Sequence, residues 1–272
     1  MNTKYTITSK DNRLIKHVKS LHQKKYRDSE GQFFVEGVKM IREAVQQGVD
    51  VFNVLVCPDI LKRVNGGEDL LDNLTGLKIQ LDSVPENVFW YISDTESPQG
   101  VLAVIGKNKD SAAGDGLDPN GVYMLIDGVQ DPGNVGTIIR TSDAIGAAGV
   151  FLSKRCADAY SPKVLRSSMG SIFRVSIFEK ANLNEIAGRM QKAGIKIAAT
   201  SLQANQYHFD INYTGGIGVV IGNESNGVST ELLSMADYTV KIPMRGGAES
   251  LNASVAAGVL MYEVLRSRWG NS

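Results

Sequence analysis

Apolar residues along the chain fall into short continuous runs and into longer segments with the period of a helix. Before residue 106, "FFVE", "VFNVLVCP" and "GVLAVIG" are runs that predict strands, and "GVKMIREAVQQG" predicts an amphipathic helix directly after the first run. Pro58 ends the second run, and further helical segments follow it. Strands that alternate with helices in this way predict a small α/β domain.

The alternation is cleaner beyond residue 120. Strands are predicted at "GVYMLIDG", "VFLS", "IKIAAT", "GIGVVIGNE" and "YTVKIPM", and helices within "PGNVGTIIRTSDAIGAAG", within "SPKVLRSSMGSIFRV" and at 251–268. Because these strands are apolar throughout, they are typical of a parallel sheet that helices cover on both faces. Ligands of such sheets bind at the carboxyl ends of the strands, so polar residues there are candidates for a site.

A polar segment separates the two patterns. Residues 106–121, "GKNKDSAAGDGLDPNG", are rich in Gly, Asp, Asn and Ser and have the composition of a linker. We therefore expect an N-terminal domain at 1–106 with a basic extension at 1–30, a linker at 107–120, and a C-terminal domain at 121–272. The expected fold class of both domains is α/β.

The composition is that of a soluble globular protein, with 29 Lys+Arg, 29 Asp+Glu and 43% hydrophobic residues. No uninterrupted apolar run reaches the roughly 18 residues of a membrane span, and the start of the chain lacks the apolar core of a signal peptide. Cys57 and Cys156 form no metal-binding spacing with each other or with the three histidines. These features predict a cytoplasmic protein without a metal site.

Net charge is zero, but basic residues gather in two stretches. Residues 1–42 hold ten Lys or Arg against four acids, and residues 154–174 hold five against one. Such patches on a neutral chain fit a shaped polyanion such as folded RNA. The alternative for the first stretch is a solvated helix face. The expected RNA contacts are Lys24, Lys25, Arg27, Lys163 and Arg166.

The first candidate site is "DGVQDPGNVGTIIRTSDAIGAAG" (127–149). Asn134 suits the N-cap of the predicted helix, since its side chain can accept from an unpaired amide. Arg140 lies off the apolar face, one turn from Gly136 and Asp143, and the alternative to a functional role is a surface Arg140–Asp143 ion pair. Gly136 favours a functional role, because glycine inside a helix often marks close packing. The glycine spacing is not G-x-G-x-x-G, which argues against a dinucleotide-binding enzyme.

Two further polar segments follow predicted strands. In Gly222-Asn223-Glu224, the glycine allows either the close approach of a ligand or a tight turn, and the other two residues suit either substrate binding or helix capping. The segment "IPMRGGAESLN" ends at the start of the last helix, where Ser250 and Asn252 can satisfy unpaired amides. Each segment alone is weak evidence for a site.

Together the three segments resemble the motifs of the SpoU (TrmH-like) branch of the SPOUT superfamily. Residues 127–149 resemble its first motif, with Asn134 and Arg140 six apart, Gly222-Asn223-Glu224 resembles the second, and "IPMRGGAESLNASVAAG" resembles the third. "CADAYSPKVLRSSMGSIFRV" resembles the segment between them, with Ser176 near a position where many relatives have Pro. "FFVEGVKMIREAV" resembles the start of the L30e-like domain that many rRNA-modifying members carry.

The resemblance implies an S-adenosylmethionine-dependent RNA ribose 2′-O-methyltransferase that works as a homodimer through its C-terminal domain. It implies a SPOUT α/β-knot domain with a largely parallel sheet, whose last helix is threaded through a loop as a deep trefoil knot. A smaller L30e-like domain would bind structured rRNA, with large-subunit rRNA as the expected target. The implied catalytic residues are Asn134, Arg140, Glu224, Ser250 and Asn252. The implied cofactor-binding residues are Gly222, Asn223, Ile242, Met244, Leu251 and Asn252.

The resemblance also implies that Arg140 acts on the ribose hydroxyl, in some relatives as a general base. A guanidinium hardly deprotonates in proteins, so we expect Arg140 to stabilise a developing alkoxide instead. Two alternatives stay open. One is a tRNA ribose 2′-O-methyltransferase, which the L30e-like domain disfavours, and the other is an RNA-binding relative without catalysis.

Overall fold

The computed structural model describes residues 6–107 and 116–269. The contacts divide the chain into two compact units, one of residues 1–109 with 160–165 and one of residues 110–159 with 166–272. The predicted linker falls partly outside the described residues, and the predicted domain boundaries stay a proposal.

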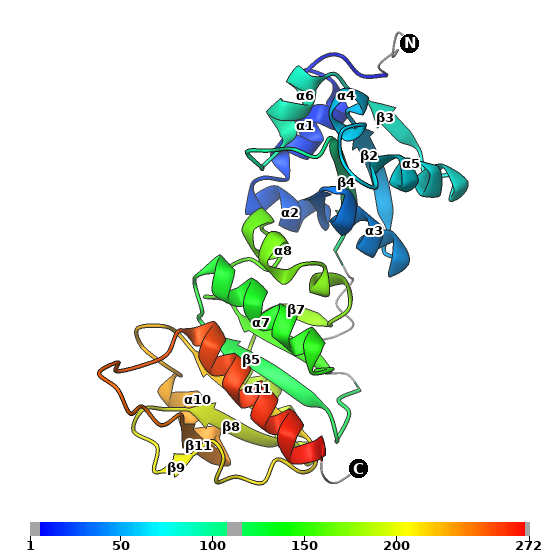
Figure 1. Ribbon diagram of the computed structural model, residues 1–272. Coiled ribbons are helices and arrows are strands. Elements are labelled where there is room, and N and C mark those ends of the chain that lie inside the picture. Colours follow the sequence, from blue (N-terminus) through cyan, green and yellow to red (C-terminus); the bar gives the residue numbers. More distant parts are fainter. Residues whose placement is uncertain (1–5, 108–115, 270–272) are drawn as a thin grey trace. The chain divides into compact units, whose positions relative to one another are not determined.

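In the described residues, the first unit contains a four-stranded sheet with helices packed around it (Figure 1). Its strands are β1 (Gln32–Glu36), β2 (Val51–Val56), β3 (Leu81–Ser83) and β4 (Val101–Gly106). Its helices are α1 (Arg13–Ser20), α2 (Lys24–Glu30), α3 (Val38–Gln46), α4 (Pro58–Leu61), α5 (Gly67–Gly76) and α6 (Glu86–Ile92). The strand order is β1-β4-β2-β3, in which β4 is antiparallel to β1 and β2, and β3 is parallel to β2. The predicted strands and the amphipathic helix are confirmed as β1, β2, β4 and α3.

Helices α1 and α2 belong to the folded body of this unit. The Asn12 side chain caps α1, and Ile15 and Val18 of α1 are fully buried in the same apolar cluster as Phe34 of β1. The expectation that residues 1–30 form an extension is therefore wrong for residues 6–30. Helix α1 is amphipathic: its apolar positions face the core, and its basic residues lie between them in the sequence.

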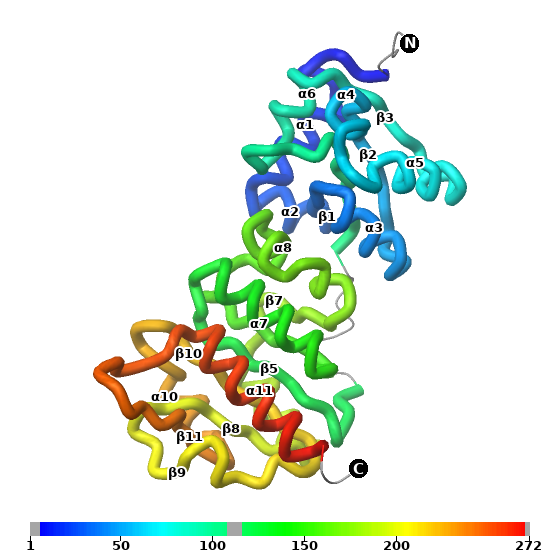
Figure 2. The backbone as a smooth tube through the Cα atoms, in the orientation of Figure 1, coloured from blue at the N-terminus to red at the C-terminus, as the bar shows by residue number. Residues whose placement is uncertain are grey.

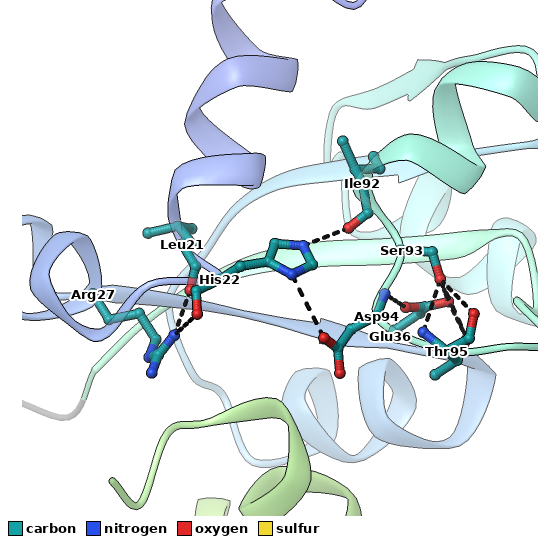
Figure 3. Close-up of polar contacts among 8 residues, drawn as sticks. All are labelled: Leu21, His22, Arg27, Glu36, Ile92, Ser93, Asp94 and Thr95. Atoms are coloured by element: carbon teal, nitrogen blue, oxygen red, sulfur yellow. Dashed lines mark hydrogen bonds and ion pairs between the residues drawn. The ribbon is translucent and has the colours of Figure 1, made fainter.

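The side chain of Arg27, on α2, is buried against the turn that joins α1 to α2. It is 3% exposed, and its Nη1 donates to Leu21 O at 2.6 Å and to His22 O at 2.8 Å (Figure 3). His22 Nε2 donates in turn to Ile92 O at 2.7 Å, which ties this junction to the end of α6. A guanidinium that satisfies main-chain oxygens inside the unit is not presented to RNA. The prediction of Arg27 as an RNA contact is therefore wrong.

Within the described residues, the second unit contains a seven-stranded sheet in the order β7-β6-β5-β10-β8-β11-β9. Its strands are β5 (Val122–Asp127), β6 (Gly149–Ser153), β7 (Ile177–Ala181), β8 (Lys196–Thr200), β9 (Gln206–Tyr207), β10 (Ile217–Gly222) and β11 (Tyr238–Lys241). Its helices are α7 (Pro132–Ala144), η1 (Ser171–Phe173), α9 (Leu183–Lys192), α10 (Thr230–Met235) and α11 (Ala253–Trp269), and α8 (Pro162–Ser168) has residues in both groupings. Each described strand pairing is parallel, so the predicted parallel sheet is confirmed. The knot stays a prediction.

Helices cover both faces of this sheet. On one face, Leu125 of β5 packs in a cluster with Ile186 and Met190 of α9. Side chains alternate along a strand, so Met124, which is also fully buried, faces the opposite side. There α7 and α11 lie side by side (Figure 1). This two-sided cover explains why the strands are apolar throughout.

The polar segments begin at one edge of the sheet. Asp127, the last residue of β5, pairs with Gly222, the last residue of β10, so the loops that leave these strands start next to each other. Residues 242–252 leave β11 at the same edge and lead into α11, a path that Figure 2 traces in orange to red. The three polar segments found in the sequence therefore converge at the carboxyl ends of the strands.

Within residues 6–107 and 116–269, no helix has the length and apolar character needed to span a bilayer. In the same residues, no three His, Cys, Asp or Glu side chains gather as metal ligands do.

Candidate functional site

A hydrogen-bonded chain of three side chains lies where β5 and β10 end. Asn252 Nδ2 donates to Asn134 Oδ1 at 2.9 Å, and Asn134 Nδ2 donates to Glu224 Oε1 at 3.0 Å. Asn134 is only 8% exposed, so its amide is engaged by these partners more than by water. Three residues from three separate segments of the sequence thus form one network.

Asp131, and not Asn134, caps helix α7. Asp131 Oδ1 accepts from Asn134 N at 2.9 Å, and Pro132 occupies the first helical position, where proline is favoured. The prediction of Asn134 as the N-cap is therefore wrong, because the helix begins earlier at the Asp-Pro pair. With the cap supplied by Asp131, the Asn134 side chain remains available to Glu224 and Asn252.

Glu224 is the charged member of the network. Burial raises the pKa of this carboxyl, but hydrogen bonds from Asn134 and from main-chain amides outweigh the burial and hold the pKa below its ordinary value of 4.5. One of these amides is Gln130 N, which lies 3.5 Å from Glu224 Oε2. Glu224 is therefore a carboxylate near neutral pH and accepts hydrogen bonds. It orients the Asn134 amide with nitrogen toward Glu224 and oxygen toward Asn252.

Asn252 connects the network to the last helix. Its Oδ1 accepts from Ser254 N at 2.9 Å and from Ser254 Oγ at 2.7 Å, and so caps α11, which begins at Ala253. The prediction that Asn252 satisfies an unpaired amide at this helix start is confirmed. Its Nδ2 is left for Asn134. Ser250, two residues earlier, is exposed and caps no described amide, so its role stays a prediction.

The loop after β10 folds back onto the end of its own strand. Asn223 N donates to Gly227 O at 3.0 Å, and Gly227 N donates to Asn223 O at 2.9 Å. A Cβ at Gly222 would lie well inside 3.0 Å of the main chain of Gly227 and Val228, so only glycine fits beneath the loop. Asn223 Nδ2 also donates to Gly128 O at 2.8 Å, which fastens the loop to the end of β5. The tight turn considered for Gly222 is therefore present.

A cavity of about 430 Å³ opens beside the network, at the carboxyl ends of β8, β10 and β11. This volume lies within the roughly 300–1,000 Å³ of pockets that hold small molecules. Glu224 and Ser250 contribute to its wall. The predicted cofactor-binding residues that line the cavity are Gly222, Asn223, Ile242, Met244 and Leu251. Asn252 does not line it, because its amide is directed toward Asn134.

One wall of the cavity was missed in the sequence. Thr200, Ser201 and Gln203 line it from the end of β8, and Thr200 Oγ1 donates to Val220 O at 3.1 Å. The signal was present, because Thr200 is the last residue of the predicted strand "IKIAAT" and Ser201 and Gln203 follow it. Applying the carboxyl-end rule to every strand would have found them.

Arg140 lies apart from the network. It is exposed on α7, and no hydrogen bond or ion pair holds its guanidinium in the part of the chain that the structure describes. Six residues of helix correspond to about 9 Å along the axis and about 120° around it, so Arg140 and Asn134 do not share a face. The alternative Arg140–Asp143 pair is wrong, because Asp143 Oδ2 accepts from Arg174 Nη2 and from Ser171 Oγ, both at 2.8 Å.

Four of the five predicted RNA contacts are exposed. Lys24 and Lys25 lie on α2, and Lys163 and Arg166 lie on α8. Exposure allows these side chains to reach a phosphate, and their role stays a prediction. Arg27 is the exception, as its burial shows.

Two family models match the chain. The model of the SpoU rRNA Methylase family matches residues 121–262, and the model of the MRM3-like substrate binding domain matches residues 12–103. The first match covers the network, the cavity and most of α11.

Named relatives and solved structures resemble nearly the whole chain. The 23S rRNA (guanosine(2553)-2'-O)-methyltransferase RlmP of Bacillus subtilis is 35% identical over 258 residues, which cover 95% of this chain and 98% of that protein. The 23S rRNA (uridine(2479)-2'-O)-methyltransferase of Streptomyces viridochromogenes is 32% identical over 267 residues, covering 96% and 92%. The crystal structure of AdoMet-bound rRNA methyltransferase from Sinorhizobium meliloti has a TM-score of 0.83 and 30% identity, covering 96% of this chain and 97% of that one. The chain belongs to the SpoU rRNA methylase family.

Proposed function

We propose that this protein transfers the methyl group of S-adenosylmethionine to a ribose 2′-hydroxyl of structured ribosomal RNA, with 23S rRNA as the substrate. The observation that carries the proposal is the Asn134–Glu224–Asn252 network on the rim of the cavity, because it sets polar groups for a ribose beside a pocket for a methyl donor. Two relatives that are 32% and 35% identical over almost the whole chain are named as 23S rRNA 2'-O-methyltransferases. Their names support 23S rRNA as the substrate.

The cavity fits a nucleoside that carries a positive charge. Ile242 and Leu251 give it apolar walls for a base, and Thr200 offers a hydroxyl. Two carboxylates, Glu224 and Glu249, line it together with Lys241, and this balance favours a cationic ligand. S-adenosylmethionine, when bound, would supply a methyl group on a positively charged sulfur.

The polar residues have separate tasks in this reaction. The 2′-hydroxyl must lose its proton and lie in line with the methyl group at about 3 Å, so orientation is a large part of catalysis. Asn134 is held from both sides by Glu224 and Asn252, and this rigidity suits it to position the ribose. Ser250, exposed on the cavity wall, contacts the substrate or the donor. Arg140 stabilises the developing alkoxide as a permanently charged cation.

The proposal includes a homodimer formed through the second unit. Helix α11 exposes Val255, Tyr262 and Trp269 by 51%, 54% and 76%, and their seven-residue spacing sets them in one stripe along the helix. Such a stripe is an apolar surface that a second copy would cover. Helix α7, which carries Arg140, packs beside α11. A dimer built on the stripe would therefore lie beside the helix that carries Arg140.

The proposal also keeps the division into an RNA-binding domain at 1–106, a linker at 107–120 and a methyltransferase domain at 121–272. The knotted path of the second unit belongs to it as well, supported by the way the loops after β10 and β11 line one cavity. A ribosomal RNA substrate would place the protein in the cytoplasm.

The test is transfer from tritium-labelled S-adenosylmethionine to ribosomal RNA and to tRNA, both from a strain that lacks the gene. Nuclease digestion and mass spectrometry would locate the product. A single 2′-O-methyl group in 23S rRNA is the expected result. Label in tRNA alone would favour the tRNA ribose methyltransferase, and cofactor binding without label in any RNA would favour a binding protein without catalysis.

A further inference from the structure

Helix α6 of the first unit presents two large aromatic rings to solvent. Trp90 is 50% exposed and Tyr91 is 38% exposed, whereas Val88, Phe89 and Ile92 of the same helix are fully buried. The three buried side chains already anchor α6 in the core. Packing within the unit therefore does not explain the two exposed rings.

Two lysines converge on one of these rings. Lys10 Nζ lies 5.0 Å and Lys19 Nζ lies 5.1 Å from the centroid of the Tyr91 ring. A ring attracts an ammonium group at this range, so Tyr91 draws two like charges to one place. The two ammonium groups repel each other, and a nearby anion would remove that repulsion.

Basic side chains outnumber acidic ones around Tyr91. Residues 10–19 hold four basic side chains against Asp11, and Asp11 Oδ1 is paired with Lys16 Nζ at 2.7 Å. Asp94 lies 3.5 Å from His22 Nδ1. Glu86, one turn before Trp90, is the acid within α6 itself. Four basic side chains against Asp11, Glu86 and Asp94 leave a surplus of one positive charge, which favours a polyanion.

The surface rests on a fixed frame. Ile92 O, at the end of α6, accepts from His22 Nε2 at 2.7 Å, and Ser93 Oγ donates to Glu36 Oε1 at 2.7 Å (Figure 3). Burial lowers the pKa of His22 below 6.5, so the ring is neutral near pH 7 and keeps its hydrogen-bond role. The end of the helix that carries the two rings is thus held in place before binding, so its main chain loses little freedom when a ligand stacks on them.

We propose that Trp90, Tyr91, Lys10 and Lys19 form a binding surface for unpaired nucleotides of the RNA substrate. The face of Trp90 stacks on a base, and the two lysines at Tyr91 contact the flanking phosphates. The inference rests on the proposed function, because it assigns a further contact to the same RNA. Exposed aromatic faces beside basic groups suit single strands, where base faces and phosphates are both accessible, so a loop or bulge is the expected element.

The tryptophan content of the chain allows a direct test of stacking. Trp90 and Trp269 are its two tryptophans, so in the full chain with Trp269→Phe the indole fluorescence reports on Trp90. Titration with a single-stranded RNA oligonucleotide should quench this emission, because a base stacks on the ring. Heparin, a polyanion without bases, should leave the emission unchanged. Equal responses to RNA and heparin, or no response to RNA, would overturn the stacking role.

Methyl transfer to 23S rRNA supplies the second test. Trp90→Ala should raise KM for the RNA roughly 5- to 100-fold, whereas Trp90→Phe should retain most of the affinity. The double variant Lys10→Gln/Lys19→Gln should reduce the salt dependence of RNA binding by about 0.7 in the logarithmic slope for each phosphate that the lysines no longer neutralise. The affinity for S-adenosylmethionine should stay unchanged in all three variants, which reports that the second unit is intact.

Matched controls come from the same unit. Phe52 is 52% exposed on β2, and Lys62 and Lys78 are exposed, so Phe52→Ala and Lys62→Gln/Lys78→Gln should behave as the wild type. An unchanged KM in folded Trp90→Ala would overturn the inference and leave the proposed function standing. Absence of transfer in the wild type would overturn the proposed function, and RNA-specific quenching of Trp90 would still support the surface.

Discussion

Replacing Asn134 by Asp would bring two carboxylates into contact, at positions 134 and 224. Asn134 Nδ2 donates to Glu224 Oε1 at 3.0 Å, and in Asn134→Asp an oxygen takes the place of that nitrogen. Two unit charges about 3 Å apart repel by about 1.4 kcal/mol in water and by about 5 kcal/mol at an effective dielectric constant of 20. Glu224 is exposed, which favours the lower part of this range. With the lost hydrogen bond, we expect the free energy of unfolding at pH 7 to fall by about 2–4 kcal/mol.

A second substitution should reverse this loss. In Asn134→Asp/Glu224→Gln, the new amide can donate to the new carboxylate, so donor and acceptor exchange places. We expect the free energy of unfolding of the double variant to lie within about 1 kcal/mol of the wild-type value. In Glu224→Gln alone, it should fall by about 1 kcal/mol or less. Urea unfolding of the four proteins at pH 7 measures the coupling between the two positions.

Two outcomes would refute this reasoning. Losses that simply add in the double variant would mean that the side chains at positions 134 and 224 do not interact. Asn134→Ala removes the hydrogen bond without adding a charge, so it separates the two effects. An equal loss in Asn134→Ala and Asn134→Asp would mean that the repulsion between carboxylates is absent.

Three further predictions concern other parts of the molecule. Gly222→Ala should abolish S-adenosylmethionine binding in calorimetry, because the added methyl group overlaps the main chain of Gly227 and displaces the cavity loop; wild-type affinity would contradict this. Burial lowers the pKa of His22 below 6.5, so its contribution to stability should be complete above about pH 6.5 and decline as the pH falls below it. In His22→Gln, the free energy of unfolding measured with urea should depend less on pH over that acid range. An unchanged dependence on pH would argue against a buried neutral ring. Arg140→Ala should abolish methyl transfer with little change in cofactor affinity, whereas the exposed control Arg63→Ala should retain transfer, and transfer at the wild-type rate in Arg140→Ala would refute the role of Arg140.

The sheet of the second unit was predictable because its central strands bury both faces. β5 and β10 are buried at every position, and a continuous apolar run records this in the sequence. β7 and β9 lie at the two ends of the strand order and were missed. β7 is only partly buried and β9 has two exposed residues, so neither leaves an apolar run. Edge strands depend on pairing with a neighbour, which the local pattern does not encode.

The site was predictable as three segments but not as a network. The bonds from Asn134 to Glu224 and Asn252 depend on the register of β5 against β10, which brings distant segments together. The cap of α7 was misassigned because Asn and Asp are equally good caps, and Pro132 decides between them. Arg27 was misassigned because a basic residue serves equally well in water or on buried carbonyl oxygens.

The network also has a consequence for the order of events in folding. Asn134 and Asn252 are separated by 118 positions, and Asn134 and Glu224 by 90. Closing loops of such length early loses more chain entropy than closing local ones, and folds built on distant parallel pairings form slowly. We therefore expect local helices to form first, and the cavity rim to be completed only when the segment before α11 docks beside the first turn of α7. During refolding, cofactor affinity should thus recover later than the helical circular dichroism signal, which makes ligand binding a late marker of the native state.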